Sequence, residues 1–498
     1  MKNKKKILAA LFAMAVLAGA VSCSKGGAGT GSTGSRETGG SGTSDGFDLL
    51  PDKKWNGAEY SVLNAELASI EGALGADFES DDSAVSPIPA SVYRRNMAVE
   101  ERFGVKITHF PTQSLYDVLS STVGSGDLDY HAVYGDYNSM SNLSAGKYLM
   151  NLRDIPHIDF TAPWWNQAAQ DSLTVGGRQY LAINDVPYST LVTSHCMYFN
   201  KSIASENQGT VGNPYDYVFD GTWTIDKLIT TSRGIAKDNG DSVWNEEDLY
   251  GVTFPIGSLT MLGVAFGESV YPVKIADGEI VETDEAKWAD MISKIYTLCY
   301  DNENGTYVGS HLSETPMTMF TQSKSLYYIG ALCDAPMYFR GMEDDFGILP
   351  LPKYNEKQEE YRTPLSGASL MLGVSTLPDK DALEFIGIIT EAMAIKSHEL
   401  LRSAVYETVF ENQLTRDEES KKTMTLIVNG LYADFVFVHA AGVGGGYYGE
   451  IHMLMDQKSD DYASARRRNK TRVENYYKGI LDIYKGLDDL KYPGRMRD

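Results

Sequence analysis

An acidic segment over residues 238–248 carries side chains of the types that bind calcium, spaced as in an EF-hand loop. Oxygen ligands fall at four of the expected positions, namely Asn239, Asp241, Asn245 and Asp248. The first position is Lys237, a cation where calcium needs a carboxylate, and Ser242 replaces the glycine expected at the turn. Calcium binding is therefore one interpretation, and a hydrogen-bonded acidic loop is the alternative.

Two other motifs resemble signatures of cofactor or metal chemistry, but both are incomplete. Residues 444–449 read GGGYYG, which matches GxGxxG, yet a basic, helix-like run over 466–472 follows where a dinucleotide site needs a helix and a second strand. Residues 398–402 read HELLR and lack the second histidine of a zinc protease. No GxSxG elbow and no P-loop is present. These motifs therefore indicate no cofactor apart from the calcium considered above.

Three cysteines follow Cys23 in the chain, and all lie in apolar surroundings: Cys196, Cys299 and Cys333. No CxxC pair exists, which argues against zinc and thioredoxin-like chemistry. We expect buried thiols, and one disulfide among the three stays open.

Length and charge limit the class of protein. The chain has 498 residues, with 44 basic and 67 acidic side chains and a formal net charge of −23. The length predicts two lobes or domains. The acidic balance argues against a nucleic-acid-binding protein, which needs a basic surface.

The N-terminal segment predicts secretion and a lipid anchor. Lysines precede an apolar run over 7–17, which has the proportions of a signal peptide and is too short to span a bilayer. The run leads to Ala20-Val21-Ser22-Cys23, which resembles a bacterial lipobox, so we expect residues 1–22 to be removed and Cys23 to be lipidated. Ordinary cleavage after Ala20 is the alternative. Residues 23–47 are rich in Gly, Ser and Thr and predict a flexible tether.

The elements that must position a site alternate between strand and helix. Strands are expected over 59–63, 105–110 and 131–134, with helices over 91–103 and 115–123. This alternation predicts an α/β fold with a largely parallel sheet, in which ligands bind at the carboxyl ends of strands. Tyr134, Asp136 and Tyr137 fall at such an end.

Later segments continue this pattern. Strands are expected over 197–199, 327–332, 346–349 and 369–374. Helices are expected over 223–235, opened by Thr222 as a capping residue, and over 382–394 and 473–490.

Several segments, taken in order, resemble the family 1 extracellular solute-binding proteins of ABC importers. They span residues 55 to about 485 and comprise 91–105 (SVYRRNMAVEERFGV), 126–133 (GDLDYHAV), 146–149 (GKYL), 162–166 (APWWN), 197–201 (MYFNK), 221–224 (GTWT), 250–251 (YG), 346–354 (FGILPLPKY) and 416–420 (RDEES). The resemblance implies a two-lobe, periplasmic-binding-protein-like fold of type II with one ligand in the cleft and no catalytic residues. We expect the first lobe to comprise 48–186 and 362–396, and the second 187–361 and 397–498.

The resemblance also implies a carbohydrate ligand, since many family members bind sugars. A sugar ring stacks on Trp or Tyr, and planar polar side chains bond its hydroxyls. Candidates at strand ends, in the first crossover and at positions where maltose-binding relatives carry aromatics are Tyr134, Asp136, Tyr137, Trp164, Trp165, Tyr188, Thr193, Tyr338, Tyr447 and Tyr448. Adjacent side chains of an extended chain point opposite ways, so at most one of the two tryptophans is expected to face the ligand.

The resemblance implies that the protein captures a solute by hinge closure and delivers it to an ABC transporter permease. The expected solute is an oligosaccharide. The protein would be an extracytoplasmic monomer, held at the bacterial membrane through Cys23. A secreted glycosidase is the alternative, because a chain with 67 acidic residues contains carboxylate pairs by chance. A ligand-presenting subunit of a sensor kinase is a third interpretation.

Overall fold

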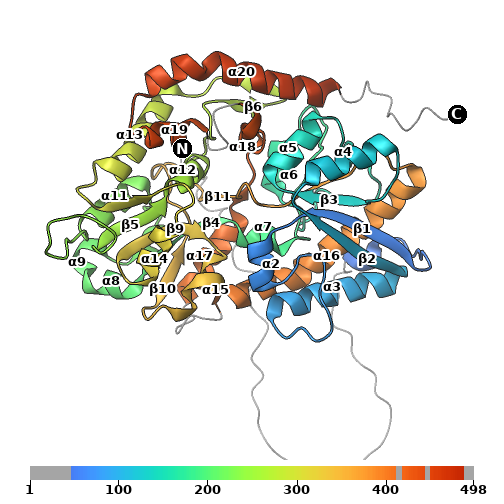
Figure 1. Cartoon of the computed structure of the whole chain (residues 1–498), viewed down its shortest axis with the longest axis horizontal. Helices are drawn as coiled ribbons and strands as arrows, with labels where there is room; N and C mark the ends of the chain where they lie inside the picture. Colours follow the sequence, from blue (N-terminus) through green and yellow to red (C-terminus); the bar gives the residue numbers. More distant parts are fainter. Residues whose placement is uncertain (1–45, 411–417, 444–448, 487–498) are drawn as a thin grey trace, which may run out of the picture. The chain divides into compact units, whose positions relative to one another are not determined.

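The computed structural model describes residues 46–410, 418–443 and 449–486. Two β-sheets of four and five strands organise this part of the chain, and helices surround each sheet (Figure 1). We call the parts around the four-stranded and five-stranded sheets the first and the second lobe. The predicted signal peptide, Cys23 and nearly all of the tether lie outside the described residues, as do Tyr447 and Tyr448. Within the three described ranges, no helix is both long and apolar enough to cross a membrane.

The sheet of the first lobe has the strand order β12-β3-β1-β2. Its strands are β1 (Ala58–Ala65), β2 (Val105–Thr112), β3 (Ala132–Gly135) and β12 (Met371–Gly373). The first three run parallel, as the sequence predicts, and β12 returns from far along the chain to pair antiparallel with β3. The helices of this lobe are α1 (Gly46–Leu49), α2 (Ala68–Leu74), α3 (Pro87–Phe103), α4 (Leu115–Ser125), α5 (Tyr137–Ala145) and α6 (Gln167–Leu173).

The sheet of the second lobe has the strand order β10-β4-β9-β5-β8. Its strands are β4 (His195–Asn200), β5 (Tyr250–Pro255), β8 (Thr306–Gly309), β9 (Ser325–Ala331) and β10 (Phe346–Leu349). Strand β5 runs parallel to β8 and β9, whereas β4 runs antiparallel to β9 and β10. The helices of this lobe are α8 (Lys201–Glu206), α9 (Gln208–Val211), α10 (Pro214–Phe219), α11 (Ile225–Arg233), α12 (Leu259–Ala265), α13 (Glu285–Tyr300), α14 (Thr315–Thr321), α15 (Asp334–Tyr338) and α17 (Glu418–Asn429).

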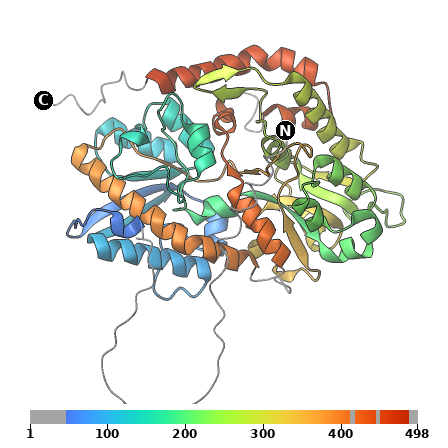
Figure 2. The ribbon, with the colours of Figure 1, turned by 180° about the vertical axis from the view of Figure 1, so that it is seen from behind.

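Several elements connect the two lobes. The short helix α7 (Tyr188–Val192) leads from the first lobe to β4, and the long helix α16 (Lys380–Phe410) packs on α3 and reaches α7 and α15 (Figure 2). The remaining elements are β6 (Lys274–Ala276), β7 (Glu279–Val281), β11 (Thr363–Pro364), β13 (Leu431–Tyr432), α18 (Phe435–Val438), α19 (Gly449–Asp456) and α20 (Tyr462–Gly486). Because α16 continues unbroken through residue 396, the predicted lobe boundary at that residue falls inside a helix.

Helix ends differ from the sequence prediction where a neighbouring side chain caps them. Helix α11 begins at Ile225, because the Oγ1 of Thr224 accepts a hydrogen bond from the backbone N–H of Lys227 at 3.3 Å. The predicted cap, Thr222, instead donates its hydroxyl to Asp220. Helices α16 and α20 both extend well beyond the apolar stretches from which they were predicted.

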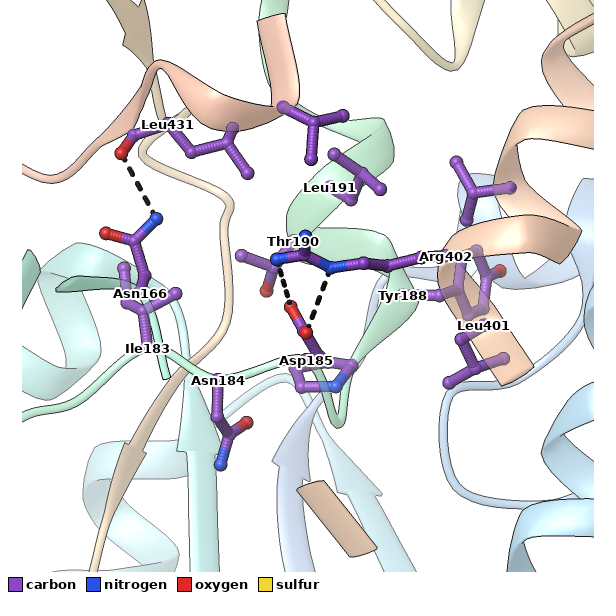
Figure 3. Close-up of a pocket in the computed structure, with 13 residues that line it drawn as sticks. Asn166, Ile183, Asn184, Asp185, Tyr188, Thr190, Leu191, Leu401, Arg402 and Leu431 are labelled. Carbon is purple, nitrogen blue, oxygen red and sulfur yellow. Dashed lines mark hydrogen bonds and ion pairs between the residues drawn. The ribbon is translucent and has the colours of Figure 1, made fainter. Parts of the chain in front are cut away.

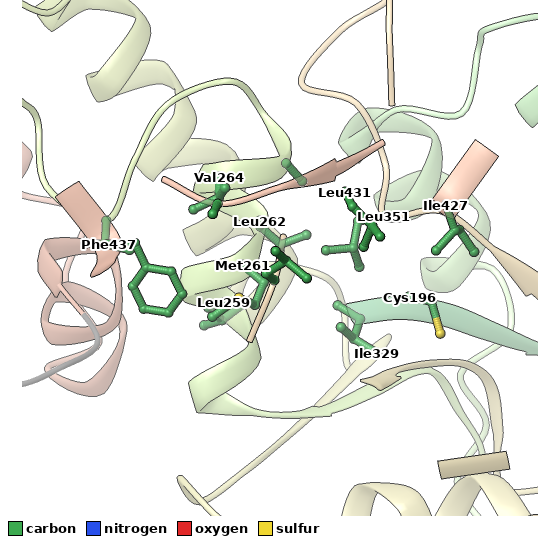
Figure 4. Close-up of a cluster of buried hydrophobic side chains, with 14 of the residues drawn as sticks. Cys196, Leu259, Met261, Leu262, Val264, Ile329, Leu351, Ile427, Leu431 and Phe437 are labelled. Atoms are coloured by element: carbon green, nitrogen blue, oxygen red, sulfur yellow. The ribbon is translucent and has the colours of Figure 1, made fainter. Parts of the chain in front are cut away.

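Two hydrophobic cores stabilise the lobes. One core lies around β1, α3 and α16 and contains Val62, Val99 and Ile386. The other is larger and extends from the second sheet through α12 and β13 to α18 (Figure 4). The thiols of Cys196, Cys299 and Cys333 are buried and free, so no disulfide joins them.

Candidate ligand-binding site

The carboxyl ends of the parallel strands are the expected place for a ligand in both sheets. In the first sheet β1 and β3 end at Ala65 and Gly135, and in the second sheet β5, β8 and β9 end at Pro255, Gly309 and Ala331. Strand β4 enters the second sheet at this same edge, because its first residue, His195, pairs with Ala331. The chain that crosses between the lobes therefore arrives at the ligand edge of the second sheet.

Helix α7 is fixed to the first lobe by side-chain hydrogen bonds. The backbone N–H of Ser189 donates to the Oδ1 of Asp77 at 3.0 Å, so this carboxylate caps the helix from outside it. The hydroxyl of Thr190 donates to the carbonyl of Leu370, the residue before β12, at 3.1 Å. Both partners lie near the ligand edge of the first sheet.

The C-terminal end of α7 is fixed to the second lobe by backbone hydrogen bonds. The N–H of Cys333 donates to the carbonyl of Val192 at 2.8 Å, and the N–H of Leu332 donates to the carbonyl of Ser194 at 3.0 Å. Cys333 and Leu332 directly follow β9. The carboxyl edges of both sheets are thus tied to one five-residue helix, and the candidate ligand site lies along these two edges.

Five of the predicted ligand residues are buried and serve the interior: Tyr134, Tyr137, Thr193, Tyr188 and Trp165. The hydroxyl of Tyr134 accepts a hydrogen bond from Asn184 at 3.1 Å, the ring of Tyr137 packs on Phe437 with centroids 5.4 Å apart, and Thr193 donates to the carbonyl of Ser189 at 2.9 Å. Tyr188 donates to the carbonyl of Gly75. The structure thus assigns these side chains to packing, and ligand contact by them stays a prediction.

The two adjacent tryptophans do not point opposite ways, so the expected extended chain is wrong here, while ligand contact by at most one of them stays a prediction. The indole N–H groups of Trp164 and Trp165 both donate to the carboxylate of Glu391 on α16, at 2.7 and 3.0 Å. The physical reason is a turn, since the N–H of Trp165 donates to the carbonyl of Ala162 and the chain is not extended there. Burial raises the pKa of Glu391 to about 7, against the lowering effect of the two indoles.

Exposed surface remains on other predicted residues. Asp136 follows β3, is partly exposed and caps α5 by accepting hydrogen bonds from the N–H and the hydroxyl of Ser139. Tyr338 at the end of α15 is 43% exposed. Trp164 is partly exposed, although its indole N–H donates a hydrogen bond to Glu391.

One carboxylate at the edge of the second sheet was missed by the sequence analysis. Asp334 follows β9 as Asp136 follows β3, and its Oδ2 accepts hydrogen bonds from the N–H of Ala331 at 2.9 Å and the hydroxyl of Tyr328 at 3.0 Å. Burial raises the pKa of Asp334 to about 6. An acidic residue just after a strand was the signal that could have found it. Oriented carboxylates thus lie at both edges, Asp77 and Asp136 at the first and Asp334 at the second, and groups of this kind accept hydrogen bonds from ligand hydroxyls.

The acidic segment over 238–248 folds into a loop in which carboxylates bind backbone amides. The two oxygens of Asp248 accept hydrogen bonds from the N–H groups of Asn239 and Asn245, each at 2.8 Å. Across the described part of the chain, no group of three or more His, Cys, Asp or Glu is placed to hold a metal ion. This geometry supports the hydrogen-bonded alternative, and calcium binding stays a prediction.

A pocket of about 30 Å³ lies between α16 and the segment from Ile183 to Leu191, which crosses between the lobes (Figure 3). Asp185 in its wall accepts hydrogen bonds from the Nε of Arg402 at 3.0 Å and from its second terminal nitrogen at 3.3 Å, and lies 2.5 Å from the Nδ1 of His398. This volume holds about one water molecule, so the pocket is too small for a sugar. The ion pair joins the crossover to the helix that reaches both lobes.

Comparisons with solved structures match the fold of the chain. No family model matches the chain, and no curated protein sequence matches it. Among solved structures, a cyclo/maltodextrin-binding protein complexed with maltotetraose superposes with a TM-score of 0.52 at 15% identity and covers 89% of this chain and 100% of its own. UspC of M. tuberculosis superposes with a TM-score of 0.51 at 11% identity and covers 84% of this chain and 100% of its own. A family 1 extracellular solute-binding protein of Alicyclobacillus acidocaldarius superposes with a TM-score of 0.50 at 11% identity and covers 87% of this chain and 100% of its own.

These structural neighbours define the fold of the chain. The two-lobe, periplasmic-binding-protein-like fold of type II that the sequence predicts is confirmed. The resemblance to family 1 solute-binding proteins, drawn from short segments, has its counterpart in neighbours that match across more than four fifths of this chain.

Proposed function

We propose that this chain is a solute-binding protein that captures an oligosaccharide between its lobes and delivers it to an ABC transporter permease. The observation that carries the proposal is the attachment of both sheet edges to α7, since a ligand that contacts both edges would draw the lobes together about this helix. The fold match to a maltodextrin-binding protein supports a sugar as the ligand. No step of this function requires catalysis.

The proposed location is the extracytoplasmic face of a bacterial membrane. The lipobox-like segment before Cys23 supports a lipid anchor there, and the Gly/Ser/Thr-rich tether would let the two-lobe part move relative to that anchor. The partners would be the permease subunits and the membrane, with the protein acting as a monomer.

The first test is a calorimetric titration of the full chain carrying Cys23→Ala with maltotetraose. Saturable binding without release of shorter sugars on long incubation supports the proposal. Slow release of shorter sugars would instead favour the glycosidase alternative. Absence of binding to maltotetraose and to a panel of other oligosaccharides would contradict the sugar assignment.

A pair of aromatic variants locates the site. Tyr338→Ala removes an exposed ring at the carboxyl edge of the second sheet, and we expect maltotetraose affinity to fall about 3- to 10-fold, the loss typical of one stacking ring. Trp244→Ala is the matched control, because Trp244 is exposed to a similar degree, at 37%, but precedes β5 at the opposite edge of the same sheet. Equal affinity losses in both variants would place the sugar elsewhere.

A further inference from the structure

A second pocket, with a volume of about 500 Å³, lies in the second lobe between the end of α10, the loop after β10 and the end of α17. Its wall contains one lysine, Lys353, two aromatic rings, and three acidic side chains. None of the residues that line it belongs to the candidate ligand site described above. Its volume falls within the range of small-molecule sites, roughly 300–1,000 Å³.

Lys353 is held rigidly and directs its ammonium group into this pocket. Its backbone N–H donates to the carbonyl of Trp223 at 3.0 Å, and its carbonyl accepts from the N–H of Ile225 at 2.9 Å. Its Nζ lies 5.3 Å from the ring centroid of Tyr361. The Nζ also lies 3.3 Å from the point where a Cβ on Gly221 would stand, so the glycine leaves room for it.

Among the described residues, the ammonium group of Lys353 lies over the ring of Tyr361 but has no anionic partner. The residue is 4% exposed, and no described residue forms an ion pair or a hydrogen bond with its Nζ. Desolvation lowers the pKa of Lys353, and the more distant carboxylates of Glu356 and Asp220 offset this only in part. A partly desolvated cation that lacks an anionic partner is costly, and such groups are concentrated at functional sites. The missing complement is an anionic group within hydrogen-bonding distance.

The rim of the pocket has the opposite charge. Asp220, Glu359 and Glu360 line it and are exposed. Helix α17 ends there as well, and the C-terminal end of a helix carries partial negative charge. A simple anion would be repelled by these carboxylates, and a simple cation would be repelled by Lys353.

We propose that this pocket binds a small zwitterion of the amino-acid type. The ligand carboxylate would pair with the Nζ of Lys353, and its ammonium group would face the acidic rim. The ring of Tyr361 forms a flat wall for the ligand and is fixed in place, because its hydroxyl donates to the carbonyl of Val218 at 3.1 Å. The site belongs to one lobe alone, so it works without lobe closure.

The test is ligand-observed NMR on the full chain carrying Cys23→Ala, with a mixture of the twenty standard amino acids and then with each binder alone. Each binder is compared with its amide, which lacks the carboxylate, and with its N-acetyl derivative, which lacks the ammonium group. We expect at least one amino acid to bind and both derivatives to lose about 10- to 100-fold in affinity, as for the loss of a charge-assisted hydrogen bond. Absence of saturable binding at millimolar concentration would overturn the proposal.

Lys353→Met should remove amino-acid binding while the protein stays folded. Because the variant also removes a partly desolvated charge that lacks an anionic partner, we expect its melting temperature to equal or exceed that of the parent. Lys227→Met is the matched control, since Lys227 also lies over a tyrosine ring of the second lobe, with its Nζ 4.3 Å from the centroid of Tyr217, but does not line the pocket. Amino-acid binding that survives in Lys353→Met, or that maltotetraose displaces, would place the ligand elsewhere and overturn the proposal.

Discussion

Each lobe buries one glutamate that accepts hydrogen bonds from tryptophan indoles, but the two carboxylates are neutralised in different ways. In the first lobe Glu391 is 2% exposed and accepts from Trp164 and Trp165. No lysine, arginine or histidine among the described residues forms an ion pair with it. The carboxylate therefore depends on neutral hydrogen-bond donors, and burial raises its pKa to about 7.

In the second lobe Glu268 is 3% exposed and accepts from the indole of Trp288 at 3.0 Å. Its other oxygen forms ion pairs with two ammonium groups. The Nζ of Lys287 lies at 2.6 Å and the Nζ of Lys274 at 3.0 Å. The charge that burial makes costly is thus balanced by cations here, whereas in the first lobe a raised pKa lets a proton neutralise the carboxylate below about pH 7. The comparison shows that an indole–carboxylate contact does not by itself decide how stability depends on pH.

The largest change in stability should come from removing one of the two indoles that bind Glu391. Trp165→Ala deletes a ring that is 1% exposed and packs on Phe160, so we expect the free energy of unfolding to fall by about 3–5 kcal/mol. Urea denaturation measures this, and Trp244→Ala, with its ring 37% exposed, is the control expected to lose less than about 1 kcal/mol. Similar losses in both variants would show that the indole pair is not part of the core.

The pH dependence of stability should distinguish the two glutamates. The folded-state pKa of Glu391 is raised from 4.5 to about 7, so its stabilising contribution is complete below about pH 4.5 and is lost as the pH rises through 7. The unfolding free energy of Glu391→Gln, relative to that of the parent, should rise by about 3 kcal/mol between pH 5 and pH 8. Parallel profiles of unfolding free energy for parent and variant would contradict this assignment.

The same substitution in the second lobe should have the opposite sign at pH 8. Glu268→Gln keeps the shape of the side chain but leaves two ammonium groups beside a neutral amide. We expect a loss of about 2 kcal/mol. Urea denaturation at pH 8 of both glutamine variants measures the contrast. A stabilised Glu268→Gln would show that its lysines do not compensate the buried charge.

The smallest effect should come from the outer lysine of this cluster. The Lys274 side chain is 41% exposed and that of Lys287 is 27% exposed, so solvent screens the Lys274 pair more strongly. We expect Lys274→Met to cost less than about 1 kcal/mol in unfolding free energy. A loss as large as that of Glu268→Gln would mean that the cluster depends on all three charges together.

The sequence predicted the elements of the first lobe better than it predicted the site. The parallel strands β1, β2 and β3 lie where the apolar runs and the glycine stops indicate, and Gly104 ends α3 with a φ of +60°. These signals are local, because propensity and capping act over a few residues. The burial of Tyr134 and Tyr137 was not readable, because it depends on Phe78 and Phe437, which come from distant segments.

By itself, the sequence determined the α/β alternation and the place of Asp136 after a strand, since each depends on neighbouring residues. Only the tertiary structure decided the rest. A turn brings Trp164 and Trp165 together on Glu391, and strand β12 returns to the first sheet. Lys353 likewise gains a pocket whose walls come from α10, α17 and its own loop. These contacts join residues far apart in the chain, and their energies follow from burial and charge that no local pattern contains.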